Sequence, residues 1–110
     1  MSDYFVKYLA GQKGSGSNTM KTYRDTFVQL LEFMDEKKHI RADCIEVDSF
    51  SYDIINEFLE YLEKEKRVSI STRNNRLAAI RSFFKYTGYH EPKYLNISTS
   101  IREISKKKTE

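Results

Sequence analysis

Residues 69–86, SISTRNNRLAAIRSFFKY, concentrate side chains that could hold an anionic polymer. The first two helical turns expected here carry short or planar hydrogen-bonding groups: Ser71, Thr72, Asn74, Asn75 and Arg76. No Asp or Glu occurs between residues 67 and 90, whereas five cations do: Arg67, Arg73, Arg76, Arg81 and Lys85. Positive charge without acid, combined with amide and hydroxyl groups, favours a polyanion as the partner.

A second polar and basic segment occurs earlier in the chain. In the helix expected over residues 17–36, polar and basic side chains stand ahead of the first acid of that helix, Asp25: Thr19, Lys21, Thr22 and Arg24. Near a helix start, Asn can meet adenine and Arg can meet guanine in the major groove of DNA. Backbone N–H groups at the same ends can bind phosphates. Because both helices must bury apolar faces in one small core, we expect these two starts to be neighbours on a surface for double-stranded DNA.

A simpler interpretation stays open for several of these residues. Ser and Thr are common at any helix start because they cap it, so Ser71 and Thr72 alone predict little more than capping. Arg81 and Lys85 could belong to a solvated face, and a protein-docking surface would also tolerate five cations. The residue types therefore indicate a charged partner without identifying it.

The same inspection finds no constellation for catalysis or metal binding. The sequence contains no paired catalytic carboxylates, no His/Cys set at metal-ligand spacing and no nucleophile beside a base. The eight tyrosines lack a local His/Arg arrangement that would activate one of them. We predict no catalytic residue, no metal ligand and no cofactor.

Composition indicates a single helical domain. The chain has 110 residues, 39% of them hydrophobic, with only one proline and four glycines. Alternating β-branched residues are scarce, so an all-α fold is the expected class. The lone Cys44 cannot form an internal disulfide, and its apolar neighbours predict a small buried filler. No signal peptide or membrane span is evident, which predicts a soluble, cytoplasmic protein without a membrane partner.

Charge is unevenly divided along the chain. Residues 1–66 hold nine Lys/Arg against thirteen Asp/Glu, whereas residues 67–110 hold ten against three. The balance therefore changes from −4 to +7. Such asymmetry predicts one basic face, with the acidic residues turned elsewhere.

Apolar periodicity and capping residues place the helices. We expect a short amphipathic helix in residues 1–10, a loop at 11–18, and helices over about 17–36, 51–66 and 69–86. Ser51 is the expected cap of the third of these, and Ser69 or Ser71 that of the fourth. The expected core positions of the last helix are Leu77, Ile80 and Phe84, and Gly88 is expected to end it.

These motifs, in this order, resemble the N-terminal core-binding domain of the tyrosine recombinases, the phage integrase family. The resemblance covers residues 17–89. The segment SNTMKTYRDTFVQLLEFM carries Thr19 and Tyr23 at family positions, and IINEFLEYL resembles the middle helix. Residues 72–86 closely match the form T-x-N-x-x-L-x-A-L-R-x-F-F-x-Y, with Ile80 replacing Leu.

The resemblance implies a SAM-like bundle of four to five orthogonally packed helices that grips duplex DNA. The starts of its second and fourth helices would enter adjacent major grooves, which places eight residues at DNA: Thr19, Lys21, Thr22, Ser71, Thr72, Asn74, Asn75 and Arg76. On this view residues 1–95 form the domain, and residues 96–110 are a polar linker or frayed tail toward a C-terminal catalytic domain. A recombinase oligomer on DNA is a further implied partner.

The chain departs from the family in lacking its catalytic residues. Neither His39 nor His90 is followed by an Arg three residues later, as the family's His-x-x-Arg pair requires. We therefore expect a recombinase fragment or stand-alone relic, inactive alone, that grips the crossover site of a parent strand-exchange enzyme. The alternative is a SAM-like protein-interaction module in which the acidic third helix of one copy pairs with the basic fourth helix of another.

Overall fold

The fold is known from a computed structural model that describes residues 17–41 and 44–108. Within these ranges the secondary structure is wholly helical, as the sequence predicts. The α-helices are α2 (Ser17–Lys38), α3 (Tyr52–Lys64), α4 (Ile70–His90) and α5 (Leu95–Arg102), and the short 3₁₀ helices are η2 (Val47–Ser49) and η3 (Pro92–Tyr94). The helix expected in residues 1–10 and residues 11–16 of the loop expected at 11–18 lie outside the described residues, whereas residues 17 and 18 belong to α2.

Two serines cap the helices that follow them. The Ser51 Oγ accepts a hydrogen bond from the Ile54 N–H at 3.2 Å, and the Ser69 Oγ accepts one from the Thr72 N–H at 3.1 Å. Each bond satisfies one of the backbone donors that a helix start leaves unpaired. The prediction of Ser51 is confirmed, and Ser69 is the cap of α4. Ser71 therefore lies inside the first turn, where it is exposed.

Non-glycine residues close the first two long helices. His39 and Arg67 have positive φ angles of 58° and 54°. Past each of them the backbone N–H bonds back over the last turn, from Ile40 to the Met34 carbonyl and from Val68 to the Leu62 carbonyl, both at 3.1 Å. This is the left-handed termination that glycine most often supplies.

Gly88 does not end α4, contrary to the prediction. Within the described residues no glycine has a positive φ, and α4 continues to His90 with Gly88 buried inside it. The glycine is instead needed for close packing, because an added Cβ would lie 2.7 Å from the Ser98 Cβ of α5. The absence of a side chain lets α5 approach the backbone of α4.

We predict that Gly88→Ala lowers the free energy of unfolding by about 1–3 kcal/mol, because the overlap outweighs the helix propensity that alanine gains. Urea denaturation of the variant measures this change. In a Ser98→Gly background the same substitution should lose its cost, since both overlapping atoms are removed. An equal loss in both backgrounds would show that the contact with α5 is not the cause.

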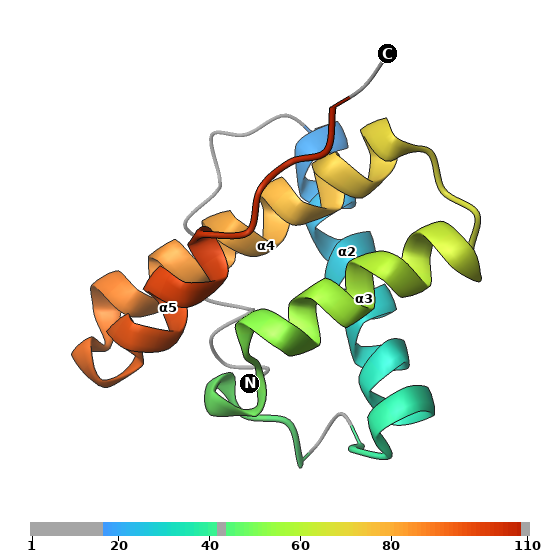
Figure 1. Ribbon diagram of the computed structural model, residues 1–110. Coiled ribbons are helices and arrows are strands. Elements are labelled where there is room, and N and C mark those ends of the chain that lie inside the picture. Colours follow the sequence, from blue (N-terminus) through green and yellow to red (C-terminus); the bar gives the residue numbers. More distant parts are fainter. Residues whose placement is uncertain (1–16, 42–43, 109–110) are drawn as a thin grey trace.

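The core lies where α2 crosses α3 and α4 at a steep angle (Figure 1). Aromatic rings join the elements: Phe27 and Phe83 have centroids 4.6 Å apart, and Phe50 and Phe84 are 5.6 Å apart. Leu77, Ile80 and Phe84 are each 0% exposed, which confirms the predicted apolar stripe of α4. The crossing arrangement agrees with the orthogonally packed bundle expected from the sequence.

Helix α5 corrects the expectation of a frayed tail from residue 96 onward. Ile101 and Ile104 are buried in the same core as the longer helices, and α5 lies along α4 (Figure 1). The segment is polar overall, so its few apolar residues are inconspicuous in the sequence. Their burial makes residues 96–104 part of the folded module.

The connection between α2 and α3 is partly as predicted. Ile45 and Val47 are buried, and Ile40 packs against the core. Cys44 is exposed, so the prediction that it fills the interior is wrong. Its neighbour Ile45 occupies the core instead. In the part of the chain that the structure describes, no helix is long and apolar enough to cross a membrane.

Candidate nucleic-acid interface

The start of α4 presents polar side chains, with the Glu63 carboxylate of α3 lying 4.0 Å from its Arg73 Nε. The first turn contains no Asp or Glu. Ser71 and Asn75 are exposed, and Thr72 and Arg76 are half-buried. The Ser69 hydroxyl donates to the Thr72 Oγ1 at 3.1 Å, so the Thr72 hydroxyl proton can still be donated outward. This end of α4 can offer hydrogen-bond donors to an anion.

The start of α2 lies at the same end of the molecule as the start of α4, the upper end in Figure 1. Lys21 and Arg24 are exposed on it, and Thr22 is half-buried. The first turn of α2 also lacks an acidic residue. The backbone of Thr19 belongs to this helix, but its side chain lies outside the described residues. Both predicted polar segments are therefore brought to one end of the module.

Asn74 has a partner within the chain. Its Nδ2 donates to the Lys107 carbonyl at 2.8 Å, and its Oδ1 accepts from the Lys107 N–H at 3.0 Å. Residues 105–108, which we call the C-terminal strap, are thereby held at the start of α4. Base reading by Asn74, as the sequence suggested, stays a prediction and would compete with these two bonds.

Arg73 is a residue whose position the sequence did not reveal. It is 5% exposed, and its Nη1 donates to the Ser105 carbonyl at 3.1 Å and to the Asn74 Oδ1 at 3.0 Å. Its Nε lies 4.0 Å from the Glu63 carboxylate, an ion pair at a distance too long for a hydrogen bond. Arg73 therefore stabilises the strap through its hydrogen bond to Ser105, and it does not contribute an exposed charge.

The acidic side of α3 is largely paired with cations of the same chain. Glu57 pairs with Lys38, Glu65 with Lys37 at 3.1 Å, and Glu63 with Lys107 at 2.9 Å. The hydrogen bond that the Lys37 ammonium donates to the Glu65 carboxylate raises the pKa of Lys37 above its ordinary value of 10.5. These pairs leave less negative charge on α3 to attract a basic helix from a second copy.

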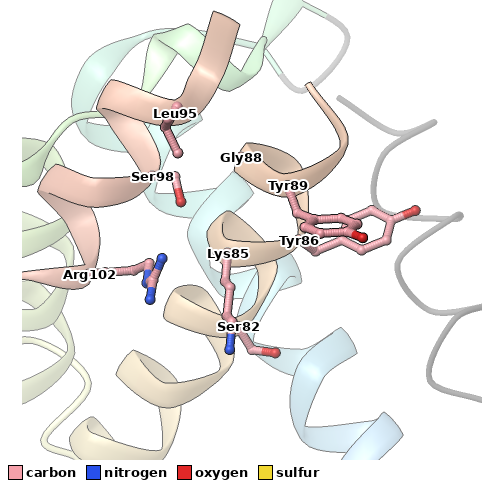
Figure 2. Close-up of a pocket in the computed structure, with 8 residues that line it drawn as sticks. All are labelled: Ser82, Lys85, Tyr86, Gly88, Tyr89, Leu95, Ser98 and Arg102. Atoms are coloured by element: carbon pink, nitrogen blue, oxygen red, sulfur yellow. The ribbon is translucent and has the colours of Figure 1, made fainter. Parts of the chain in front are cut away.

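A cavity of about 410 Å³ lies between α4 and α5, at the far end of α4. Figure 2 shows the residues that line it: Ser82, Lys85, Tyr86, Gly88, Tyr89, Leu95, Ser98 and Arg102. None of the predicted DNA-binding residues is among them. Lys85 follows Ser71 by fourteen residues of helix, which is about 20 Å. The cavity is thus separate from the polar start of α4.

The crossed helices of the described residues agree with a SAM-like helical module, the class that comparison with protein families identifies. The chain belongs to the family described as the phage integrase N-terminal SAM-like domain, which it matches over residues 3–93. No solved structure matches it significantly.

Curated relatives agree with this family. The chain is 32% identical over 94 residues to a protein of Sinorhizobium fredii named as integrase/recombinase y4rC, covering 86% of this chain and 28% of the relative. A second protein of that organism, named as integrase/recombinase y4rD, is 31% identical over 94% of the chain and 37% of its own length. Tyrosine recombinase XerC of Herpetosiphon aurantiacus is 36% identical over 76% of the chain and 26% of its own length. The chain thus spans roughly a quarter to just over a third of these relatives.

Proposed function

We propose that this core-binding domain of a tyrosine recombinase or integrase grips duplex DNA at the crossover site through the starts of α2 and α4. The first turn of α4, which contains no acidic residue and carries exposed polar residues beside the positive end of the helix dipole, is the observation that carries the proposal. Lys21, Arg24 and Arg76 would meet phosphates. The remaining proposed contacts come from side chains that can donate hydrogen bonds: Thr19, Thr22, Ser71, Thr72 and Asn75.

Charge placement supports DNA over a second copy of the chain. In the self-pairing alternative, the acidic α3 of one copy attracts the basic α4 of another. Glu57, Glu63 and Glu65 already pair with lysines of their own chain, so such an association would first have to break those pairs. Duplex DNA requires no such exchange, because each bound cation releases condensed counterions from the phosphates.

We predict that Lys21→Ala combined with Arg76→Ala reduces the salt dependence of DNA binding. If each cation neutralises one phosphate, the log–log slope of affinity against salt should decrease in magnitude by roughly 2. Fluorescence anisotropy with a short labelled duplex at three salt concentrations measures the slope. The variant should bind more weakly at low salt and approach the wild type at high salt.

A matched control removes the same net charge elsewhere. Lys93 belongs to η3 at the other end of α4, and Arg102 ends α5 near Ser82 and Lys85 of α4; both are exposed. The log–log salt slope of the Lys93→Ala/Arg102→Ala variant should differ from the wild-type slope by less than roughly 0.9, the contribution of one phosphate contact. An unchanged slope in the Lys21/Arg76 variant, or an equal decrease in both, would exclude a local interface at the two helix starts.

The parent protein is proposed to be a DNA strand-exchange enzyme. This chain spans 28% and 37% of the two integrase-like relatives, and the matched family is an N-terminal domain. A C-terminal catalytic domain, and other copies of the recombinase on DNA, are the partners we propose for it. In that setting the module positions the enzyme on its site and takes no part in the chemistry.

A further inference from the structure

The C-terminal strap is fixed to the module by contacts of three kinds. Ile104, immediately before it, is 2% exposed and anchors it in the core. The Asn74 carboxamide then pairs with both the N–H and the carbonyl of Lys107, at 3.0 and 2.8 Å. Arg73 reaches the Ser105 carbonyl at 3.1 Å. These bonds connect residues 32 or 33 positions apart in sequence, so they fix where the chain runs after α5.

The three lysines of the strap have different surroundings. The Lys107 Nζ lies 2.9 and 3.2 Å from the two carboxylate oxygens of Glu63, so its charge is paired. Lys106 and Lys108 are exposed, and neither makes an ion pair or hydrogen bond within the described part of the chain. The fold therefore pairs the middle cation with α3 and leaves its two neighbours to the solvent.

The position of the strap decides what these free charges can do. Figure 1 shows the chain returning from α5 across α4 to the upper end of the molecule, where α2 and α4 begin. Arg73 and Asn74, which hold the strap, directly precede Asn75 and Arg76 of the proposed interface. Two exposed ammonium groups, without an ion pair among the described residues, are thus carried by the strap that Asn74 holds at the start of α4. An exposed lysine there needs no defined geometry to neutralise a phosphate.

We propose that the C-terminal strap is a third DNA-contacting element, in which Lys106 and Lys108 meet backbone phosphates while Asn74 acts as a positioning residue. The inference rests on the proposed function. In this proposal the Asn74 side chain binds the Lys107 backbone and not a base, so base contacts are left to its neighbour Asn75. It also places the backbone of residues 106–108 at the DNA surface.

The direct test compares two charge variants of the full chain in the same salt titration with a labelled duplex. Lys106→Ala with Lys108→Ala should reduce the slope by roughly 2, whereas Lys107→Ala, whose charge is already paired, should change it by less than about 0.9. An unchanged slope in the Lys106/Lys108 variant overturns the inference. If that happens while Lys21→Ala/Arg76→Ala still reduces the slope, the proposed function stands and only the strap contact fails. Absence of binding by the wild type overturns both.

The positioning role of Asn74 has a readout that does not require DNA. The Lys107 N–H, donated to the Asn74 Oδ1, should exchange slowly with deuterium in the wild type and at least tenfold faster in Asn74→Ala. Fast exchange in the wild type would show that the strap is not held. In DNA binding, Asn74→Ala should weaken affinity several-fold, and it should have little further effect in the Lys106/Lys108 variant. An additive loss that depends on DNA sequence would instead make Asn74 a base-reading residue.

Discussion

Phe84→Ala is expected to lower the free energy of unfolding by about 3–5 kcal/mol, the largest effect of any substitution considered. The side chain is 0% exposed, and its ring lies 5.6 Å from that of Phe50 and 5.3 Å from that of Phe83, in edge-to-face contacts. Truncation would remove these contacts and leave a cavity where α4 meets the segment before α3. Urea denaturation monitored by circular dichroism measures the change.

The neighbouring Lys85 provides the control for Phe84. It is exposed on the same turn of α4, so Lys85→Ala should change stability by less than about 0.5 kcal/mol. A loss below about 1 kcal/mol for Phe84→Ala would contradict the burial assigned to α4, because large-to-small substitutions in a packed core cost more. The register of the helix would then have to be different.

Ile101→Ala is expected to destabilise the fold by about 2–5 kcal/mol. Ile101 is 0% exposed and belongs to the hydrophobic core together with residues of α2, α3 and α4. If α5 were a frayed linker, its truncation would cost almost nothing. The substitution therefore tests whether residues 96–104 are part of the module, and chemical denaturation gives the answer.

Thr99, exposed on the same helix, separates packing from helix propensity. Thr99→Ala should be neutral or slightly stabilising, by less than about 0.7 kcal/mol, because alanine is the better helix former. If Ile101→Ala resembles Thr99→Ala in stability, α5 contributes nothing to the core. If the unfolding transitions of both variants are less cooperative than that of the wild type, α5 unfolds separately from the other helices.

Local signals explain what the sequence predicts correctly. Ser51 and Ser69 stand directly before apolar periodic segments, and side-chain capping depends only on residues two to three positions away. Leu77, Ile80 and Phe84 recur on one helical face, which requires burial whatever the partner. These features determine the fold class and most of the core.

The errors come from contacts between distant residues. Glycine often ends a helix, so the sequence predicts that role for Gly88, but the approach of Ser98 decides its role. Ile101 and Ile104 are isolated apolar residues in a polar segment, so no periodic stripe identifies them. The Asn74 carboxamide bonds to a backbone 33 residues away, which no local pattern indicates. Tertiary packing overrides the local signal in each case.

The candidate interface was only partly predictable for the same reason. Exposure of Lys21, Arg24, Ser71 and Asn75 agrees with a surface role, and an acid-free segment is visible in the sequence itself. Arg73 is as basic as Arg76 in the sequence, yet it is 5% exposed and binds the strap. Counting cations therefore overestimates the charge that can reach a partner.

The most direct test of the central claim, that the starts of α2 and α4 bind duplex DNA, is a titration of the chain with a short labelled duplex at three salt concentrations. We predict binding at low salt with a log–log slope of several, at roughly 0.9 per phosphate contact. The slope should decrease in the Lys21/Arg76 variant and not in the Lys93/Arg102 control. No binding at low salt and high protein concentration would contradict the account and favour a protein partner for this face.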